Sequence, residues 1–286
     1  MSEMTYATVA VVGAGTMGAG IAQVCAQAGS SVVLQDINDD FVQKGLGRIR
    51  DFLQKGVDKG KVTVEQRDLV LSRITTTTDR SAACRGAGLV IEAVPEKLEL
   101  KNGLFRQLGD VVSPACVLAS NTSSLSLAKV FDGVRGPERC VGMHFFNPVP
   151  LMALLEVVRT AATSQATVDA VVGYGKVLGK EGIVVKDSPG FASSRLGVCL
   201  GLEAIRMLES GVASAEDIDK AMVLGYGHPM GPLKLTDLVG LDVRLAIADY
   251  LAKELAHPGF QAPQLMRRMV EQGKLGKKSG QGFYRW

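Results

Sequence analysis

The stretch that decides the fold is Gly13-Ala14-Gly15-Thr16-Met17-Gly18. It follows a short β-branched run, Ala7 to Val12, and opens a segment with helical periodicity. Between a strand and a helix this spacing has a physical reason. Gly13 permits a tight turn, Gly15 lets the backbone approach a pyrophosphate, and Gly18 packs helix against strand. Free N–H groups at the positive end of the helix would hold the diphosphate, so the stretch predicts a dinucleotide site.

A carboxylate follows the next predicted strand at the position that such a site requires. Ser31 to Gln35 reads as a strand and ends at Asp36, eighteen residues after Gly18. A carboxylate there can bind both hydroxyls of a ribose. The residues after Asp36 are Ile37 and Asn38, with no adjacent Arg to hold a 2′-phosphate. The sequence therefore favours NAD over NADP as the cofactor.

Length, charge and cysteine usage limit the class of protein. A chain of 286 residues is long enough for two domains, and a formal net charge of +3 without blocks of like charge gives no reason to expect a nucleic-acid partner. The five Cys are scattered without a C-x-x-C pair, which indicates reduced thiols in a cytosolic protein, and we predict no metal site. We find no signal segment or membrane-length apolar run, so we expect a cytoplasmic protein without membrane contact.

Strands that alternate with helices up to residue 187 predict a doubly wound parallel sheet. Ligands of such sheets bind at the carboxyl ends of the strands. Five polar residues fall at these predicted ends: Glu96, Asn121, Ser123, His144 and Asn147. Their shared placement makes them candidates for a common site.

His144 and Glu156 are the residues best suited to proton transfer. His144 is one of only three His and lies beside two aromatic residues, before Asn147-Pro148. Its side chain is the one that titrates near neutral pH without perturbation. Glu156 lies inside the apolar run Leu154 to Val158, where a buried carboxylate needs a partner. Taken singly, His144 could instead be a hydrogen-bonded core residue and Glu156 a charge on an edge strand.

The predicted helix from Asn38 to about Lys61 is rich in basic residues, including Lys55 and Lys59. Such a helix is either a solvated charged face or a basic wall for a substrate that carries phosphate.

A second domain begins after Lys186-Asp187-Ser188-Pro189-Gly190, because Pro and Gly together mark a boundary. We place the domains at 1–187, for binding NAD, and 188–286, for binding substrate. The second is expected to be all helical, with a capping box at Ser214 to Asp217 and one helix from Leu235 to Leu255. Its apolar face is large for roughly a hundred residues, so we expect a homodimer formed through this domain.

With these residues identified, the chain resembles the L-3-hydroxyacyl-CoA dehydrogenase family, most closely the short bacterial 3-hydroxybutyryl-CoA dehydrogenases. Long ordered motifs over nearly the whole chain carry the resemblance. Besides the glycine loop they are Asn121-Thr122-Ser123-Ser124-Leu125, His144-Phe145-Phe146-Asn147-Pro148-Val149-Pro150, Lys186-Asp187-Ser188-Pro189-Gly190-Phe191, Pro229-Met230-Gly231-Pro232 and Gly276-Lys277-Lys278-Ser279-Gly280-Gln281-Gly282-Phe283-Tyr284. The resemblance implies NAD-linked oxidation of the 3-hydroxyl group of an acyl-CoA, or the reverse reduction, within fatty acid β-oxidation.

The resemblance also implies residue roles. His144 would take the hydroxyl proton, Glu156 would orient it, and Ser123 would bind the substrate oxygen. Lys55 and Lys59 would meet the phosphates of CoA. The residues expected at the cofactor are Gly13, Gly15, Thr16, Met17, Gly18, Asp36, Glu96, Lys101, Asn121, Ser123, Asn147 and Lys278.

Ser194 departs from the family pattern, which commonly has Asn in the catalytic group at this position. Serine keeps a donor and an acceptor but is shorter, so the substrate contact could be lost, bridged by water, or adapted to another acyl group. Two alternatives therefore stay open: an NAD-dependent dehydrogenase of a CoA-free 3-hydroxy acid, and an idle NAD-binding protein.

Overall fold

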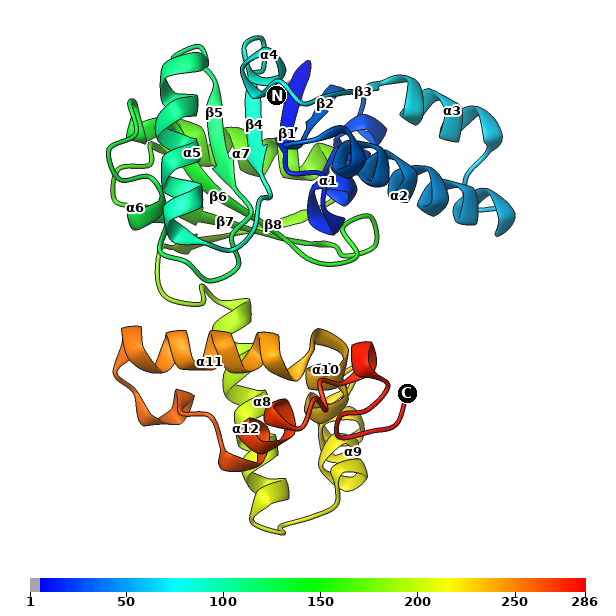
Figure 1. Cartoon of the computed structure of the whole chain (residues 1–286), viewed down its shortest axis with the longest axis vertical. Helices are drawn as coiled ribbons and strands as arrows, with labels where there is room; N and C mark the ends of the chain where they lie inside the picture. Colours follow the sequence, from blue (N-terminus) through cyan, green and yellow to red (C-terminus); the bar gives the residue numbers. More distant parts are fainter. Residues whose placement is uncertain (1–5) are drawn as a thin grey trace. The chain divides into compact units, whose positions relative to one another are not determined.

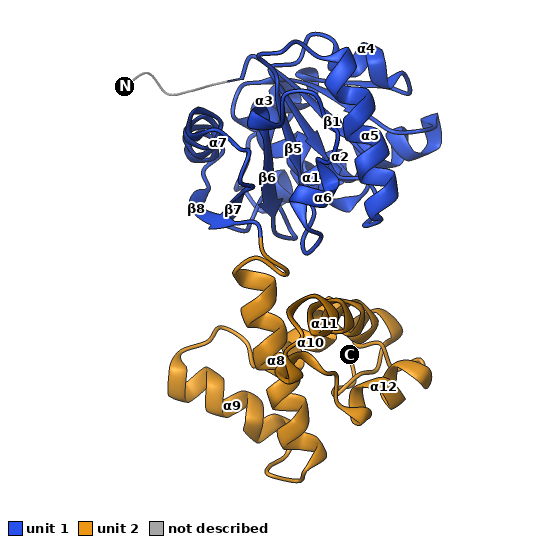
Figure 2. Cartoon of the chain, turned by 90° about the vertical axis from the view of Figure 1, so that its left-hand side faces the viewer, with its two compact units in different colours: residues 1–187 blue, residues 188–286 orange. Residues whose placement is uncertain are grey.

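The computed structural model describes residues 6–286 and has two compact units, Met1–Asp187 and Ser188–Trp286 (Figure 2). Each unit has its own hydrophobic core. Among the described residues, no helix is both long and apolar enough to cross a membrane.

Unit 1 is built on a sheet whose strand order is β3-β2-β1-β4-β5-β6-β7-β8 (Figure 1). The strands are β1 (Thr8–Val12), β2 (Ser31–Gln35), β3 (Ile74–Thr77), β4 (Leu89–Glu92), β5 (Val117–Ser120), β6 (Cys140–Phe145), β7 (Leu154–Arg159) and β8 (Glu181–Lys186). The order reverses direction between β1 and β4, which is the switch point where doubly wound sheets bind ligands. The predicted α/β class, a Rossmann-type sheet followed by a helical part, is confirmed.

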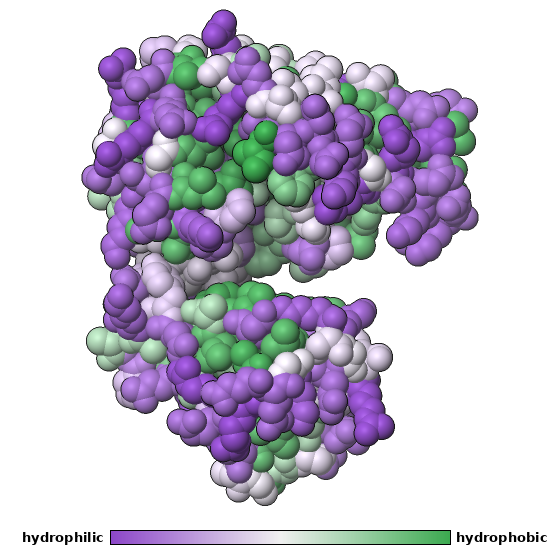
Figure 3. Space-filling model, in the orientation of Figure 1, coloured by the Kyte–Doolittle hydropathy of each residue, from purple (hydrophilic) through white to green (hydrophobic). Residues whose placement is uncertain are grey.

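Helices cover both faces of this sheet. They are α1 (Thr16–Gln27), α2 (Asp39–Asp58), α3 (Val64–Ser72), α4 (Arg80–Cys84), α5 (Leu98–Val111), α6 (Leu127–Val130) and α7 (Gln165–Val177), with a 3-10 turn η1 (Pro137–Arg139). Val9 and Val11 of β1 share one core with Ile21 of α1, Ile49 of α2 and Val171 of α7. Alternate residues of a strand face opposite sides, so the other strand positions face α4, α5 and α6. The outer surface over α2 and α3 is mainly hydrophilic (Figure 3).

The last two strands, β7 and β8, run against the predicted direction. β7 is antiparallel to β6, and the register pairs His144 with Glu156. Only residues 146–153 connect the two strands, whereas a parallel return needs a crossover of about a dozen residues or more. β8 pairs with β7 on its other side, so Glu156 lies inside the sheet and the alternative of an edge-strand charge is wrong.

Three local features also differ from the sequence-based expectation. The short helix α4 was not predicted, because five residues carry no periodicity. Gly240, with φ of 104°, ends the expected Leu235–Leu255 helix and divides it in two. Ser214 does cap its helix by accepting from the Asp217 N–H, but the reciprocal capping box is found at Thr63 and Gln66 instead.

Unit 2 consists of helices and the turns between them. The helices are α8 (Ser193–Glu209), α9 (Ala215–Tyr226), α10 (Pro232–Val239), α11 (Leu241–Leu255) and α12 (Gln264–Glu271), with 3-10 turns η2 (Pro258–Phe260) and η3 (Lys277–Ser279). Leu202, Ile205, Leu233 and Leu251 are among the residues that form its core.

The carboxyl-terminal segment of unit 2 folds back onto one buried carboxylate. Asp237 of α10 is fully buried and accepts hydrogen bonds from the backbone N–H groups of Phe283 and Tyr284, each at 2.9 Å. It also accepts from the indole Nε1 of Trp286 at 3.0 Å. A Cβ added at Gly282 would overlap the same carboxylate, so the close approach requires glycine.

We predict that Asp237→Asn lowers the free energy of unfolding by about 2 kcal/mol, because an amide NH₂ cannot accept from the donors that now face a carboxylate oxygen. Urea unfolding followed by the fluorescence of Trp286, the single Trp, provides the measurement. The amides of Phe283 and Tyr284 should lose protection from hydrogen exchange. Asp249→Asn, which alters an exposed ion pair with Arg267, is the control. Unchanged stability and protection in Asp237→Asn would contradict the role of this carboxylate.

Candidate functional site

The carboxyl ends of β1, β4, β5 and β6 lie side by side along one edge of the sheet. Asn121 connects three of these ends. Its backbone N–H donates to the carbonyl of Glu92 at 2.9 Å, and its side-chain Oδ1 accepts from the N–H of Phe145 at 2.9 Å. The residues predicted at strand ends therefore share one edge of unit 1, and Asn121 fixes the end of β6 next to the end of β5.

His144 and Glu156 form a buried pair at this edge. The distance from His144 Nδ1 to Glu156 Oε2 is 2.6 Å, and both side chains are almost fully buried. The ring of Phe146 packs against the imidazole, with ring centroids 4.4 Å apart. Because a carboxylate accepts hydrogen bonds, the pair assigns the proton to Nδ1 and leaves the lone pair of a neutral ring on Nε2.

Ser123 belongs to a second set of polar contacts. Oε1 of Glu96 accepts from the Thr122 hydroxyl at 2.5 Å, from the Ser123 N–H at 3.0 Å and from the Ser123 hydroxyl at 3.4 Å. Oε2 of Glu96 lies 3.2 Å from Nζ of Lys101. The ammonium of Lys101 contacts Glu92 Oε1 at 2.6 Å, so a continuous chain of charged contacts runs from Glu92 to Ser123.

Glu92 is the buried anchor of this chain. It is fully buried at the end of β4, and burial raises the pKa of its carboxyl group against the lowering effect of Lys101. Its oxygens also accept from the Ser120 hydroxyl at 2.6 Å and from the Val94 N–H at 2.7 Å. These contacts satisfy a carboxylate that would otherwise be costly to bury.

The sequence did not identify Glu92, although its signal is visible: a Glu within the apolar run Leu89 to Val94 with a Lys nine residues later. Lys101 was expected at the cofactor. In the structure its side chain is buried, and its ammonium also donates to the carbonyl of Val94 at 3.2 Å. Lys101 is not among the residues that line the cavity described next.

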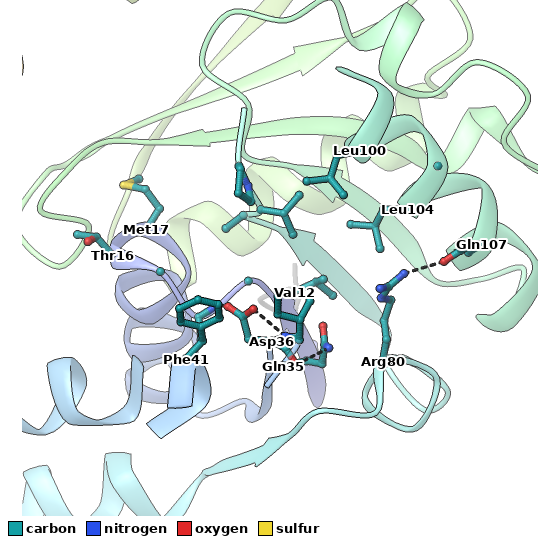
Figure 4. Close-up of a pocket in the computed structure, with 18 of the residues that line it drawn as sticks. Val12, Thr16, Met17, Gln35, Asp36, Phe41, Arg80, Leu100, Leu104 and Gln107 are labelled. Carbon is teal, nitrogen blue, oxygen red and sulfur yellow. Dashed lines mark hydrogen bonds between the residues drawn. The ribbon is translucent and has the colours of Figure 1, made fainter. Parts of the chain in front are cut away.

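A cavity of about 850 Å³ opens at the glycine loop (Figure 4). Gly13, Gly15, Thr16, Met17 and Asp36 line it, together with residues of α5. Asp36 Oδ2 accepts from the Ala14 N–H at 2.6 Å, and Oδ1 accepts from the Ile37 N–H at 2.7 Å. The carboxylate is therefore held at the end of β2, beside the glycine loop.

The glycine positions can be tested for their fit to a dinucleotide. A Cβ at Gly13 would lie 2.6 Å from the carbonyl oxygen of Ala93, and one at Gly18 would overlap the Gly13 carbonyl. Both glycines thus permit close packing within the protein. A Cβ at Gly15 would meet nothing within 4 Å, so the space above this backbone is open to a ligand. The loop therefore fits the diphosphate of NAD.

The other predicted residues of unit 1 named below are not among those that line this cavity. Asn147 lines a smaller cavity of about 100 Å³ with Thr16. Lys55 and Lys59 are exposed at the end of α2 and line neither cavity. Ser194 and Lys278 belong to unit 2: Ser194 is in the first turn of α8, and Lys278 pairs with Asp242 at 2.6 Å.

The residues that line the larger cavity but were not identified as site residues from the sequence include Phe41, Arg48, Arg80 and Gln107. Arg48 donates to the carbonyl of Ala14 at 3.3 Å, although its surroundings in the sequence indicate a solvated helix face. Arg80 and Gln107 are brought to the cavity by α4 and α5, and no spacing in the sequence links them to the glycine loop.

We predict that Lys101→Met lowers the free energy of unfolding by about 3–5 kcal/mol at neutral pH, because it leaves Glu92 buried without its ammonium partner. Loss of Lys101 removes a contribution that lowers the pKa of Glu92, so this pKa rises further. At pH values above 4.5, the ordinary pKa of a Glu side chain, Glu92 is ionised in the unfolded chain but keeps its proton in the folded variant up to its raised pKa. The destabilisation relative to the wild type should therefore increase as pH rises.

Urea unfolding across about pH 4 to 8 measures this difference, with the exposed Lys97→Met as control. Adding Glu92→Gln to Lys101→Met should recover part of the stability. A deficit that does not depend on pH would contradict the assignment of a charged buried pair.

Comparison with known proteins places both units in one family. Residues 8–188 match the family description "3-hydroxyacyl-CoA dehydrogenase, NAD binding domain", and residues 190–286 match its C-terminal domain. A 3-hydroxybutyryl-CoA dehydrogenase of Mycobacterium tuberculosis is 47% identical over 96% of this chain and 97% of its own length. The mitochondrial hydroxyacyl-coenzyme A dehydrogenase of Sus scrofa is 43% identical over 97% of this chain and 90% of its own.

Solved structures agree with this placement. An (S)-3-hydroxybutyryl-CoA dehydrogenase from Ralstonia eutropha aligns with a TM-score of 0.93 at 43% identity, over 99% of both chains. A diketoreductase aligns with a TM-score of 0.87 at 29% identity, over 100% of both chains. The predicted resemblance and the predicted NAD cofactor are confirmed. The chain belongs to the 3-hydroxyacyl-CoA dehydrogenase family.

Proposed function

We propose that the protein interconverts an L-3-hydroxyacyl-CoA and the corresponding 3-oxoacyl-CoA, using NAD, with short acyl chains such as 3-hydroxybutyryl preferred. The observation that carries this proposal is the buried His144–Glu156 pair, on the same sheet edge as the dinucleotide loop. The names of the relatives from Mycobacterium tuberculosis and Ralstonia eutropha support the short-chain preference. Fatty acid β-oxidation is the metabolic setting that fits this reaction.

In this mechanism Nε2 of His144 takes the proton of the 3-hydroxyl group in the oxidative direction and returns it in the reductive direction. Glu156 holds Nδ1–H and stabilises the imidazolium that forms, because its carboxylate is 2.6 Å away and has no access to solvent. NAD, when bound, supplies the acceptor for the hydride that leaves the carbon bearing the 3-hydroxyl group. The protein contributes the proton acceptor, its orientation and the exclusion of water.

Ser123 is proposed to bind the substrate oxygen through its hydroxyl group. Glu96 accepts from both the N–H and the hydroxyl of Ser123, which fixes the position of this side chain at the end of β5. Ser194 is proposed as a further donor to the substrate carbonyl, where the family commonly has Asn. The shorter side chain would reach the carbonyl directly or through a water molecule.

The cofactor is proposed to lie with its diphosphate on the glycine loop and a ribose diol on Asp36. The other proposed cofactor contacts are Glu96, Lys101, Asn121, Ser123, Asn147 and Lys278. Lys101 would act through Glu96, because its ammonium is engaged there and with Glu92. Lys55 and Lys59 are exposed, as side chains that meet the phosphates of CoA must be.

Unit 2 is proposed to bind substrate and to form a homodimer. Several large apolar side chains of this unit are exposed: Leu196, Val212, Leu224, Tyr226, Leu238, Val239, Val243 and Trp286. Hydrophobic surface of this unit is visible in Figure 3, and such surface is typical of subunit interfaces. A cytoplasmic location is proposed from the free cysteines, four of which are buried as reduced thiols.

A CoA-free 3-hydroxy acid or dicarbonyl compound is the second candidate substrate. Ser194 favours it, since this position departs from the family, and the similar diketoreductase is described as acting on dicarbonyl compounds. The discriminating experiment follows NADH absorbance with acetoacetyl-CoA, longer 3-oxoacyl-CoAs and free acetoacetate. Turnover of acetoacetyl-CoA far above that of acetoacetate supports the proposal. Turnover of free acetoacetate alone would favour the second candidate, and no turnover with NADH still bound would indicate an idle NAD-binding protein.

We predict that His144→Gln lowers kcat by a factor on the order of a hundred or more, because the general base is lost, while NADH affinity stays nearly unchanged. Steady-state kinetics with acetoacetyl-CoA and a separate NADH titration measure the two quantities. The matched control is His257→Gln, which replaces the His directly before the 3-10 turn η2 of unit 2. A kcat for His144→Gln close to that of the wild type would remove His144 from the mechanism.

We predict that Asp36→Ala weakens NADH binding by at least about tenfold, because the carboxylate no longer accepts from the ribose hydroxyls. NADPH binding should change much less, since the same carboxylate repels a 2′-phosphate. Direct titration of both cofactors measures this ratio, and Asp39→Ala, in the first turn of α2, is the control. An equal loss for both cofactors would show that Asp36 does not choose between them.

A further inference from the structure

The turns after β2 and β3 are tied together by one buried amide. Gln35, the last residue of β2, is almost fully buried. Its Nε2 donates to the carbonyl of Asp36 at 2.8 Å and to the carbonyl of Thr78 at 3.1 Å. The segment that leads into α4 is therefore held beside Asp36, and Arg80, the first residue of α4, is fixed close to the end of β2.

Arg80 is held in turn by Gln107 of α5. Its Nη1 donates to Gln107 Oε1 at 2.7 Å, and Asp79 caps α4 by accepting from the Ala82 N–H at 3.0 Å. Both Arg80 and Gln107 line the larger cavity. Figure 4 shows them beyond Asp36 as seen from Thr16 and Met17 of the dinucleotide loop.

The walls of the cavity at this end are apolar. Leu100 and Leu104 of α5 line it near Arg80, and Gly103 between them carries no side chain. Ile37, after Asp36, is among the most exposed large apolar residues of the chain. A slot with apolar walls and a polar edge is complementary to a flat heteroaromatic ring.

We propose that Arg80 and Gln107 recognise the adenine base of NAD. The inference rests on the proposed placement of the cofactor. With the diphosphate on the glycine loop and the adjoining ribose on Asp36, the adenine base lies beyond Asp36, on the side away from the loop. Adenine ring nitrogens accept hydrogen bonds, and the guanidinium of Arg80 carries several donors. Gln107 gives its Oε1 to Arg80, so its Nε2–H groups are the donors it can present to the same ring.

Hypoxanthine distinguishes this arrangement from simple packing, because it carries a hydrogen on N1 where adenine has a lone pair. A donor directed at N1 therefore binds adenine better than hypoxanthine, whereas a donor directed at N3 or N7 does not distinguish the two bases, and the guanidinium of Arg80 is assigned to N1. A guanidinium at this place could also bind the 2′-phosphate of NADPH, but the negative charge of Asp36 would repel that phosphate. These two uses predict different effects of removing Arg80.

The test is direct titration of the full-length protein, without any acyl-CoA, with NADH, ADP-ribose, NADPH and reduced nicotinamide hypoxanthine dinucleotide. Arg80→Ala should weaken NADH and ADP-ribose by about tenfold, and Gln107→Leu by several-fold, as expected for lost hydrogen bonds from a charged and a neutral donor. The wild type should prefer the adenine cofactor, and Arg80→Ala should reduce that preference. Arg106→Ala, on the same helix but paired with the exposed Asp132, should change nothing.

Unchanged affinities in a folded Arg80→Ala protein, or an adenine preference that survives both substitutions, would overturn the inference. A larger loss for NADPH than for NADH would also overturn it and identify a phosphate site. Circular dichroism establishes that each variant is folded, and Gln107→Leu leaves the cap of α4 in place. Because the titration needs no turnover, failure of base recognition is separable from absence of acetoacetyl-CoA reduction, which concerns the proposed function alone.

Discussion

The hydrogen bond between His144 and Glu156 is the constraint on which the site depends. A carboxylate inside a sheet is costly unless it is paired, and here the antiparallel register of β6 and β7 places its partner directly opposite. The short connection between these strands sets that register, and β8 covers the far side of β7. The change of strand direction between β6 and β7 thus places a buried base opposite the carboxylate that defines its tautomer.

The same principle applies at the neighbouring strand end. Glu92 and Lys101 are both buried, and the ion pair between them offsets the free energy that burial of each charge costs. From this anchor Glu96 reaches Ser123, while Asn121 ties the end of β5 to the end of β6. The proposed substrate-binding group Ser123 is therefore positioned by a series of contacts that begins at a buried ion pair, and such support keeps an active site rigid.

Much of this arrangement could be predicted because its signals are local. The Gly13 to Gly18 spacing, the carboxylate after β2 and the polar residues at strand ends are each encoded within a few residues. The direction of β7 and the contacts of Glu92 and Arg80 depend on which segments meet in three dimensions, and no spacing encodes that. Ser194 illustrates the converse: the sequence shows the departure from the family, but its effect depends on a substrate.

The central claim is that Glu156 fixes the proton of a neutral His144 on Nδ1, leaving Nε2 as the base. Nitrogen-15 NMR of the imidazole groups tests it most directly, and with only three His in the chain the spectrum is simple to assign by comparison with His144→Gln. At a pH where the ring is neutral, the account predicts a protonated Nδ1 and an unprotonated Nε2. A neutral ring with its proton on Nε2 would contradict it.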